Sequence, residues 1–202
     1  MVIAVKFIKE NSYDIVKLMV NQIGITIFSL VLQMAVLEIK DDAILTKVMV
    51  VVSAFATLFY FALIYTAAWD YGARDKIRID GGKLTATPAK GLLLSLIANI
   101  PNFLMASLAV ISMIIFLANG ADGAYSFFAV INLFLRFSNA MFLGIIQGVF
   151  SFLKSDVNIS YLWQSVGYLI APVITALVTH LGYEMGLREL RIFKPAANNS
   201  SK

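Results

Sequence analysis

The sequence predicts an all-α, polytopic helical membrane protein, and two observations carry that prediction. The chain of 202 residues is 60% hydrophobic and only 14% charged, and its mean hydropathy of +0.84 is too high for an ordinary soluble domain. All twelve acidic residues also fall outside five long apolar stretches. These stretches lie at 18–37, 46–68, 91–118, 127–153 and 162–183.

Each of the five stretches is long enough to cross a bilayer as a helix. A hydrocarbon core of about 30 Å requires about 20 apolar residues in helical form, because a backbone in lipid must satisfy its own hydrogen bonds. A soluble bundle would instead need charges at helical spacing on every outer face, and the stretches lack them. We therefore expect residues 1–194 to form one transmembrane bundle and the small polar residues 195–202 to form a disordered tail.

The N-terminal region predicts a retained first span. Lysines precede the stretch 18–37, and no small-residue cleavage site follows it, so it does not resemble a removable signal peptide. Residues 3–15 mix apolar and charged side chains, which suits either a short helix in the membrane interface or a ragged N-terminus.

The positions of lysine and arginine predict that both termini are cytoplasmic. Residues 69–90 hold five of these bases, which places this segment, and hence the N-terminus, in the cytoplasm. Five simple crossings would put the C-terminus outside, with nine lysines and arginines in the cytoplasm and six outside. A cytoplasmic C-terminus gives twelve inside and three outside, which fits the enrichment of these bases in the cytoplasm better. One of the three later stretches then does not make a single crossing. The candidates are 91–118, which contains Pro101, and 127–153, which contains Arg136, and we favour 127–153 because of its intramembrane charge.

Two segments share one pattern: aromatic, acid, any residue, glycine, any residue, arginine, acid. The residues concerned are Trp69, Asp70, Gly72 and Arg74 in residues 69–75, and Tyr183, Glu184, Gly186 and Arg188 in residues 183–189. In a helix the acid and the arginine lie at i and i+4, which predicts an ion pair in each segment. The aromatic rings suit an interfacial belt, and the small residues suit close helix packing. A parallel internal repeat and a common way of ending a membrane helix at the cytoplasmic surface both explain the pattern.

Polar side chains line one face of every stretch and must face one another in the bundle. In the first, second and fifth stretches they are Gln22, Thr26, Ser29 and Gln33; Thr46, Ser53, Thr57 and Tyr60; and Gln164, Tyr168, Thr175 and Thr179. One explanation is hydrogen bonding between helices, and the other is a hydrated cavity or path.

The candidate polar path or intramembrane site lies in the third and fourth stretches. Its residues are Arg136, Asn132, Asn139, Asn99, Asn102 and Gln147. No acidic residue lies in any stretch to pair with Arg136, so its partner must be an amide or carbonyl, an acid from a loop, water, lipid phosphate or an anionic ligand. A purely structural arginine held by neighbouring asparagines is the alternative. Pro101 frees the carbonyl of Ile97, and we expect the flanking asparagines to satisfy it.

The composition argues against catalysis and cofactors. The chain has no cysteine and one histidine, so a thiolate site or a histidine cluster is excluded, and we expect no metal or cofactor. The stretches contain no carboxylate pair or Ser/His/Asp set, which predicts that the protein is not an enzyme. The net charge of +4 is explained by anionic lipids at the cytoplasmic face and not by nucleic acid.

The sequence therefore predicts a small integral membrane protein of a bacterial cytoplasmic membrane. The preferred function is a pore, a carrier or a carrier subunit for small polar or anionic solutes. The alternative is a non-catalytic accessory or structural subunit that docks a larger membrane complex. The polar stripes and small-residue faces also suit a homo-oligomer or a membrane protein partner.

Overall fold

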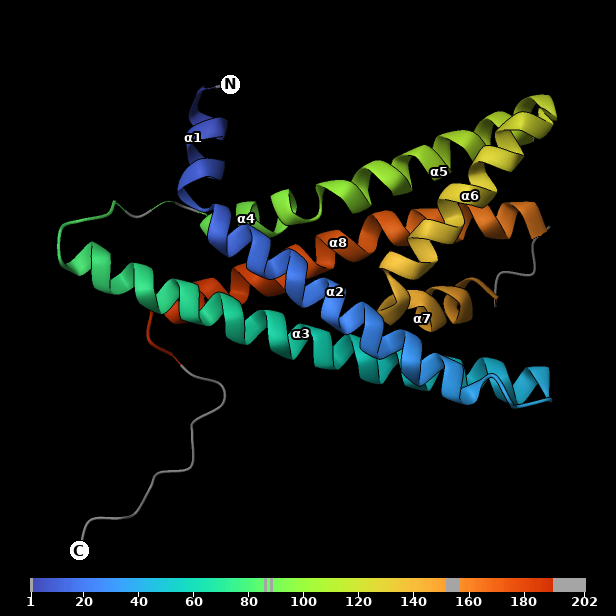
Figure 1. Cartoon of the computed structure of the whole chain (residues 1–202), viewed down its shortest axis with the longest axis horizontal. Coiled ribbons are helices and arrows are strands. Elements are labelled where there is room, and N and C mark those ends of the chain that lie inside the picture. The colour runs from blue at the N-terminus through green and yellow to red at the C-terminus, as the bar shows by residue number, and fades with distance from the viewer. Residues whose placement is uncertain (1, 86, 88, 152–156, 191–202) are drawn as a thin grey trace, which may run out of the picture.

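A computed structural model describes residues 2–85, 87, 89–151 and 157–190, and this part of the chain is helical without any strand (Figure 1). The all-α prediction is confirmed. The predicted disordered tail, 195–202, lies outside the described residues. The helices are α1 (Val2–Glu10), α2 (Ser12–Val36), α3 (Asp42–Asp80), α4 (Lys90–Ala98), α5 (Ile100–Asn119), α6 (Asp122–Ser138), α7 (Ala140–Ser151) and α8 (Val157–Leu187).

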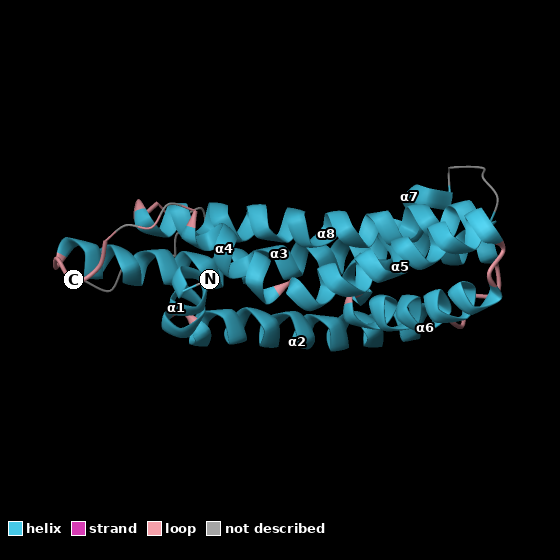
Figure 2. Ribbon diagram, turned by 90° about the horizontal axis from the view of Figure 1, so that it is seen from above, coloured by secondary structure: helices cyan, strands magenta, loops and turns pink. Residues whose placement is uncertain are grey.

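The long helices run side by side along one axis (Figures 1 and 2). The start of α2, the end of α3 and the end of α8 lie together at one end of the bundle, on the left of Figure 1, which we call the α1 end. The α2–α3 turn and the α5–α6 turn lie at the opposite end, which we call the α2–α3 end. The first and last described helices therefore begin and end, respectively, at the same end of the bundle.

The helix lengths and the surface are compatible with an integral membrane protein. Helices α2, α3, α5 and α8 are each long and apolar enough to span a bilayer. Large apolar side chains are exposed around the bundle, and polar ones such as Ser29, Thr179 and Asn139 are buried in it. This distribution is the reverse of that in a soluble domain.

Helices α6 and α7 form the bent segment among the candidate spans. Their axes meet at 117° across a break at Asn139, so they form either a broken span or a re-entrant loop. In Figure 1, α6 begins and α7 ends on the side of the α2–α3 end, and the break lies near the middle of the bundle. This geometry agrees with the choice of 127–153 as the stretch that does not cross once.

Residues 69–80 of the basic segment 69–90 are helical, so this segment is not a loop throughout. Helix α3 continues from the apolar stretch 46–68 to Asp80, and its 39 residues make a helix about 58 Å long at 1.5 Å per residue. Residues 69–80 contain no proline, Lys76 pairs with Asp80 at 2.6 Å within the helix, and the segment packs against α8 through Gly72, so the helix continues. The helix ends where Gly82 adopts a φ of +67°.

The chain breaks at Asn99 between α4 and α5, and the expected role of the asparagines there is wrong in detail. Pro101 occupies the first turn of α5, where its missing N–H is not needed. The Asn99 side chain donates to the Ser95 carbonyl at 2.9 Å and not to Ile97, because α4 already ends at Ala98. The two helices continue in a similar direction, unlike α6 and α7 (Figure 1).

Helix α1 supports the interfacial interpretation of the N-terminus. It runs across the bundle axis at the α1 end in both views (Figures 1 and 2). Val5 and Ile8 are exposed on it, whereas Phe7 packs against the core. A helix in this position would lie along a membrane surface.

Candidate functional site

The break between α6 and α7 is held by polar side chains from two other helices. Thr26 of α2 donates its hydroxyl to the Ser138 carbonyl at 3.0 Å, and Thr57 of α3 donates to the Met141 carbonyl at 2.8 Å. The Gln33 amide of α2 donates to the Ala140 carbonyl. The break frees the carbonyls at the C-terminal end of α6, such as that of Ser138, and these are costly to leave unpaired away from water. Ala140 and Met141 begin α7, so the hydrogen bonds of Gln33 and Thr57 to their carbonyls tie the start of this helix to α2 and α3. Part of the stripes on α2 and α3 therefore acts through hydrogen bonds to this break, whereas Ser29 and Thr46 bond within their own helices.

Glycines bring α7 against α3. The Gly144 N–H donates to the Ser53 hydroxyl at 2.8 Å. A Cβ added at Gly144 would collide with the Met49 carbonyl, and one at Gly148 would collide with the Val50 side chain. The small residues thus allow the close approach that lets Ser53 reach the α7 backbone.

We expect the hydrogen bond of Thr57 to contribute measurably to stability. Thr57→Val keeps the shape of the side chain but removes the interhelical hydrogen bond to the Met141 carbonyl, which should lower the free energy of unfolding by about 1 kcal/mol. Unfolding in mixed micelles with increasing SDS measures this loss. Thr66→Val is the matched control, because Thr66 is exposed and bonds only within its own helix. Equal effects of both variants would contradict the proposed role of the stripe.

Three of the predicted asparagines form one hydrogen-bonded chain. The Asn139 amide donates to Asn102 Oδ1 at 3.3 Å, Asn102 donates to Asn99 Oδ1 at 3.1 Å, and Asn99 donates to its own helix. All three are buried, and Asn139 Oδ1 has no hydrogen-bond partner among the described residues. Asn102 also lines a cavity of about 190 Å³ with Gln22, Thr26, Pro101, Ser138 and neighbouring apolar residues.

Arg136 lines a separate cavity of about 500 Å³, which shares no lining residue with the first. Its Nη2 approaches Gln164 Oε1 at 3.4 Å, and its guanidinium lies 6.0 Å from the centre of the Tyr161 ring. Its Nε is buried without a hydrogen-bond partner in the described structure. The remaining lining comes from the α2–α3 end, α7 and the start of α8, namely Leu37, Leu45, Thr46, Met49, Gly144, Gln147, Gly148 and Ser160.

The structure divides the predicted polar path into two groups. Gln147 shares the cavity of Arg136, whereas Asn99, Asn102 and Asn139 belong to the amide chain. Asn132 is buried on α6, one helical turn before Arg136. Gln164, which contacts the guanidinium, was predicted to belong to the polar stripe of the fifth stretch and not to the candidate site. Its position at i+3 from Tyr161 places both residues on the face of α8 that Arg136 meets.

The two segments with the shared pattern pack against each other at the α1 end. An added Cβ at Gly72 would collide with the Tyr183 carbonyl, and one at Gly186 would collide with the Trp69 carbonyl. The contact is reciprocal, because each glycine faces the aromatic position of the other segment, and α3 and α8 run in the same direction (Figure 1). Both segments therefore lie at the same end of the bundle. Whether a duplication produced it stays a prediction.

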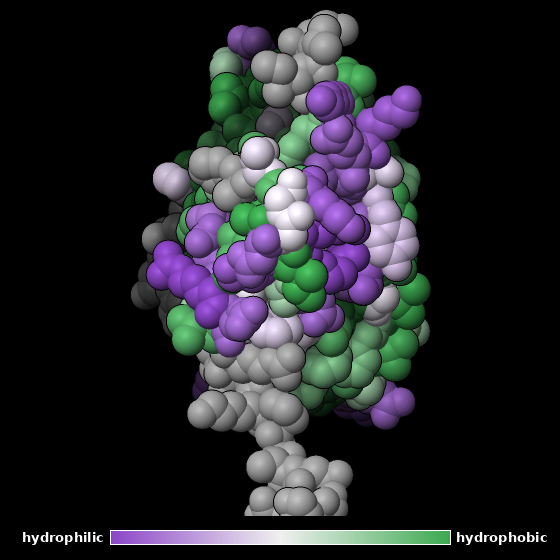
Figure 3. All heavy atoms as spheres, turned by 90° about the vertical axis from the view of Figure 1, so that its left-hand side faces the viewer, coloured by the Kyte–Doolittle hydropathy of each residue, from purple (hydrophilic) through white to green (hydrophobic). Residues whose placement is uncertain are grey.

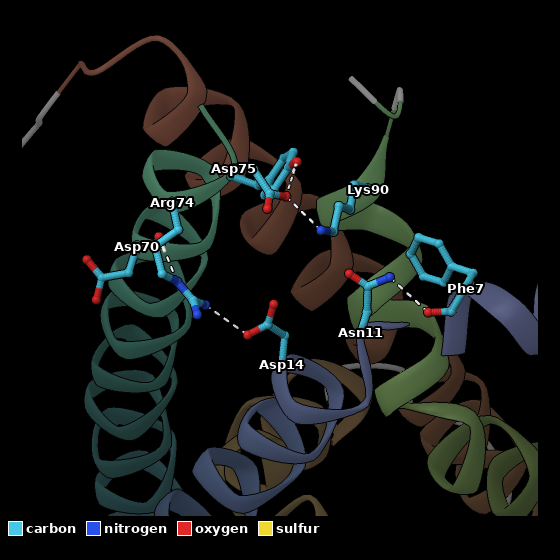
Figure 4. Close-up of polar contacts among 8 residues, drawn as sticks. Phe7, Asn11, Asp14, Asp70, Arg74, Asp75 and Lys90 are labelled. Atoms are coloured by element: carbon cyan, nitrogen blue, oxygen red, sulfur yellow. Dashed lines mark hydrogen bonds and ion pairs between the residues drawn. The ribbon is translucent and has the colours of Figure 1, made fainter. Parts of the chain in front are cut away.

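Only one of the two predicted i, i+4 ion pairs forms. Arg188 pairs with Glu184 at 3.7 Å. Arg74 instead pairs with Asp14 of α2 at 2.8 Å, because the first turn of α2 lies next to this part of α3 (Figure 4). Burial lowers the pKa of Arg74, but the hydrogen bond and charge of Asp14 outweigh burial, so the net shift is upward.

The aromatic residues of the pattern also differ from the expected belt. Trp69 is partly buried and donates its indole N–H to the Leu190 carbonyl at 2.7 Å. Tyr183 is fully buried, and its hydroxyl donates to Asp75 Oδ2 at 2.8 Å. The close α3–α8 contact draws both rings into the bundle.

A buried ion pair lies at this end, and the sequence analysis missed it. Lys90 Nζ of α4 is 2.7 Å from Asp75 Oδ2, and these side chains are only 9% and 5% exposed (Figure 4). Together with Tyr183 they connect α3, α4 and α8. Both charges lie outside the apolar stretches and looked like solvated loop residues. The available signal was that Asp75 occupies the final acid position of the shared pattern, three residues beyond Gly72 and on the packed side of the helix.

Comparison with known proteins gives no family assignment, since no family model, curated protein or solved structure matches this chain. Within the described ranges, no group of three or more histidine, aspartate or glutamate residues could hold a metal ion.

Proposed function

We propose that this protein is a small carrier or pore that binds small anionic solutes at Arg136. The observation that carries this proposal is a guanidinium that lines a cavity of about 500 Å³ without any carboxylate in the lining. An arginine inside a membrane bundle is costly unless it has a partner, and a weak contact of 3.4 Å to one amide satisfies little of that cost. An anion would satisfy it.

The other lining groups are suited to a small polar anion. The buried Nε of Arg136 has an unused N–H, and a guanidinium can bind a carboxylate or a phosphate through two parallel hydrogen bonds. Gln147, Gln164 and Ser160 line the same cavity and offer further hydrogen bonds. The volume lies in the range of about 300–1,000 Å³ that is usual for small-molecule sites.

The hairpin of α6 and α7 supports passage through the bundle. The cavity of Arg136 reaches toward the α2–α3 end, and the smaller cavity lined by Gln22, Thr26 and Asn102 shares no lining residue with it. Broken helices at such midpoints are typical of membrane transporters, where irregular backbone is tolerated next to a cavity. Movement of the hairpin would connect the two cavities in turn.

Anion flux into proteoliposomes tests this proposal. We expect the wild-type protein to pass small carboxylates or inorganic phosphate faster than glycerol. Arg136→Ala should reduce anion flux by about tenfold or more, because it removes a charged hydrogen-bond partner worth 1.5–3 kcal/mol. Arg136→Lys should keep part of the flux, since it keeps the charge.

Arg78→Ala is the matched control, because Arg78 is exposed at the opposite end of the bundle. Anion flux that is equal in the wild type and in Arg136→Ala would refute the proposal. That outcome would favour an accessory subunit, in which the arginine is structural.

A further inference from the structure

A second candidate binding site lies at the α1 end, far from Arg136. A groove of about 370 Å³ runs between α2 and α3. It is lined by Tyr13, Lys17, Asp70, Ala73, Arg74 and Ile77. Figure 3 views this end of the molecule and shows that its surface is largely hydrophilic, in contrast to the apolar flanks.

The groove presents charges of both signs that are held in fixed places. Lys17 Nζ lies 5.7 Å from the centre of the Tyr71 ring, and the Arg74 guanidinium lies 5.0 Å from the same centre. Arg74 is already paired with Asp14. Lys17 and the Asp70 carboxylate form no ion pair with any described residue, and Figure 4 shows Asp70 projecting away from Asp14. One cation and one anion are therefore left to meet a ligand.

The groove lies at the depth of a phospholipid headgroup. Lys17 directly precedes the apolar stretch 18–37, and Asp70 follows the stretch 46–68 by two positions. From these residues the groove continues outward for one to two helical turns, to Tyr13 and Ile77. This length matches the headgroup layer, which adds roughly 5–8 Å to each side of the hydrocarbon core.

The surface on either side of this boundary suits a lipid more than a soluble ion. Val20 lies two turns inward from Tyr13 on the same face of α2 and is 57% exposed, so it can contact an acyl chain. Tyr13 is 71% exposed at the outer edge, where its ring can receive an ammonium group.

We propose that this groove binds a phospholipid whose headgroup carries both a phosphate and an ammonium group. Lys17 receives the phosphate, beside the Arg74 that is paired with Asp14, and Asp70 receives the ammonium. A headgroup that lacks the ammonium would place its phosphate near the Asp70 carboxylate without a cation between the two negative charges. The groove therefore discriminates by repulsion as well as by attraction. This site differs from the general attraction of basic residues to anionic lipids, and it does not depend on the anion site at Arg136.

Lipid competition on the purified full-length chain tests the proposal. The protein is held in micelles with equal amounts of phosphatidylethanolamine and phosphatidylglycerol, and native mass spectrometry counts the lipids that stay bound. We expect about threefold more phosphatidylethanolamine than phosphatidylglycerol on the wild type, which is the scale of an exposed ion pair. Lys17→Gln should reduce the binding of both lipids, whereas Asp70→Asn should reduce only phosphatidylethanolamine and remove the preference.

Lys83→Gln and Asp80→Asn are the controls, because both side chains are exposed at the same end but outside the groove. Both controls should keep the wild-type preference. A wild-type preference for phosphatidylglycerol, or an unchanged preference in Asp70→Asn, would overturn the proposal. Soluble phosphoethanolamine at the same concentration should displace little lipid, and full displacement by it would also overturn the assignment to a lipid.

Discussion

Gly186→Ala is expected to lower the free energy of unfolding by about 3 kcal/mol, the upper part of the range for overpacking a tight contact. The added methyl group would meet the backbone of Trp69 and Ala73, which cannot move aside like a flexible side chain. Helices α3 and α8 would have to separate along the contact. Thermal or SDS unfolding of the purified protein in micelles measures the loss, and Gly72→Ala should give a similar loss because the contact is reciprocal.

Gly24→Ala is the matched control. Gly24 also lies within a helix, but a Cβ there meets nothing within 4 Å. Alanine is the better helix former by about 0.5–1 kcal/mol, so this variant should be neutral or slightly more stable. Equal stability of Gly186→Ala and Gly24→Ala would show that α3 and α8 do not approach each other as described.

Lys90→Met should be the second strongly destabilising substitution, with a loss of about 3–5 kcal/mol. It leaves the carboxylate of Asp75 buried without its cation, while the hydroxyl of Tyr183 provides only one hydrogen bond. The measurement is again unfolding in micelles at neutral pH. Lys76→Met should change stability little, because Lys76 and its partner Asp80 are exposed.

The double variant Lys90→Met with Asp75→Asn separates a broken ion pair from a loss of packing. The neutral amide still accepts the hydrogen bond from Tyr183, but no uncompensated charge remains in the protein. We expect it to recover most of the stability lost in Lys90→Met. A double variant as unstable as the single one would mean that the lysine acts through packing and not through its charge.

Much of the fold follows from the sequence because lipid imposes simple conditions on a chain. Apolar length and the absence of acids located the four helices that are long enough to span a bilayer and the bent pair α6–α7, and Arg136 pointed to that bent pair. The apolar stretch 46–68 did not give the end of α3, which lies twelve residues further on, at Asp80. A helix can continue past the apolar region where its side chains pair and pack, as Lys76 with Asp80 and Gly72 against α8 do, and α3 ends before Gly81 and Gly82.

The sites were less predictable because they depend on which helix faces which. The polar stripes could be identified along each helix, but their target, the backbone around Asn139, became visible only with the break in place. Arg74 illustrates the same limit, since a partner four residues away in its own helix was available, yet Asp14 from another helix took it. Local spacing predicts candidate pairs, whereas the packing of distant segments decides between them.

The carbonyls of Ser138, Ala140 and Met141 are all bound by side chains of α2 and α3. This arrangement has a consequence for the order of assembly during synthesis. A hairpin that entered lipid alone would leave the Ser138 carbonyl at the end of α6 without its donor and would lose the two bonds that hold the start of α7, so it is more stable beside helices that have already been inserted. Because α2 and α3 leave the ribosome first, the donors are in place before the hairpin arrives, and moving these helices to the end of the gene would remove that advantage.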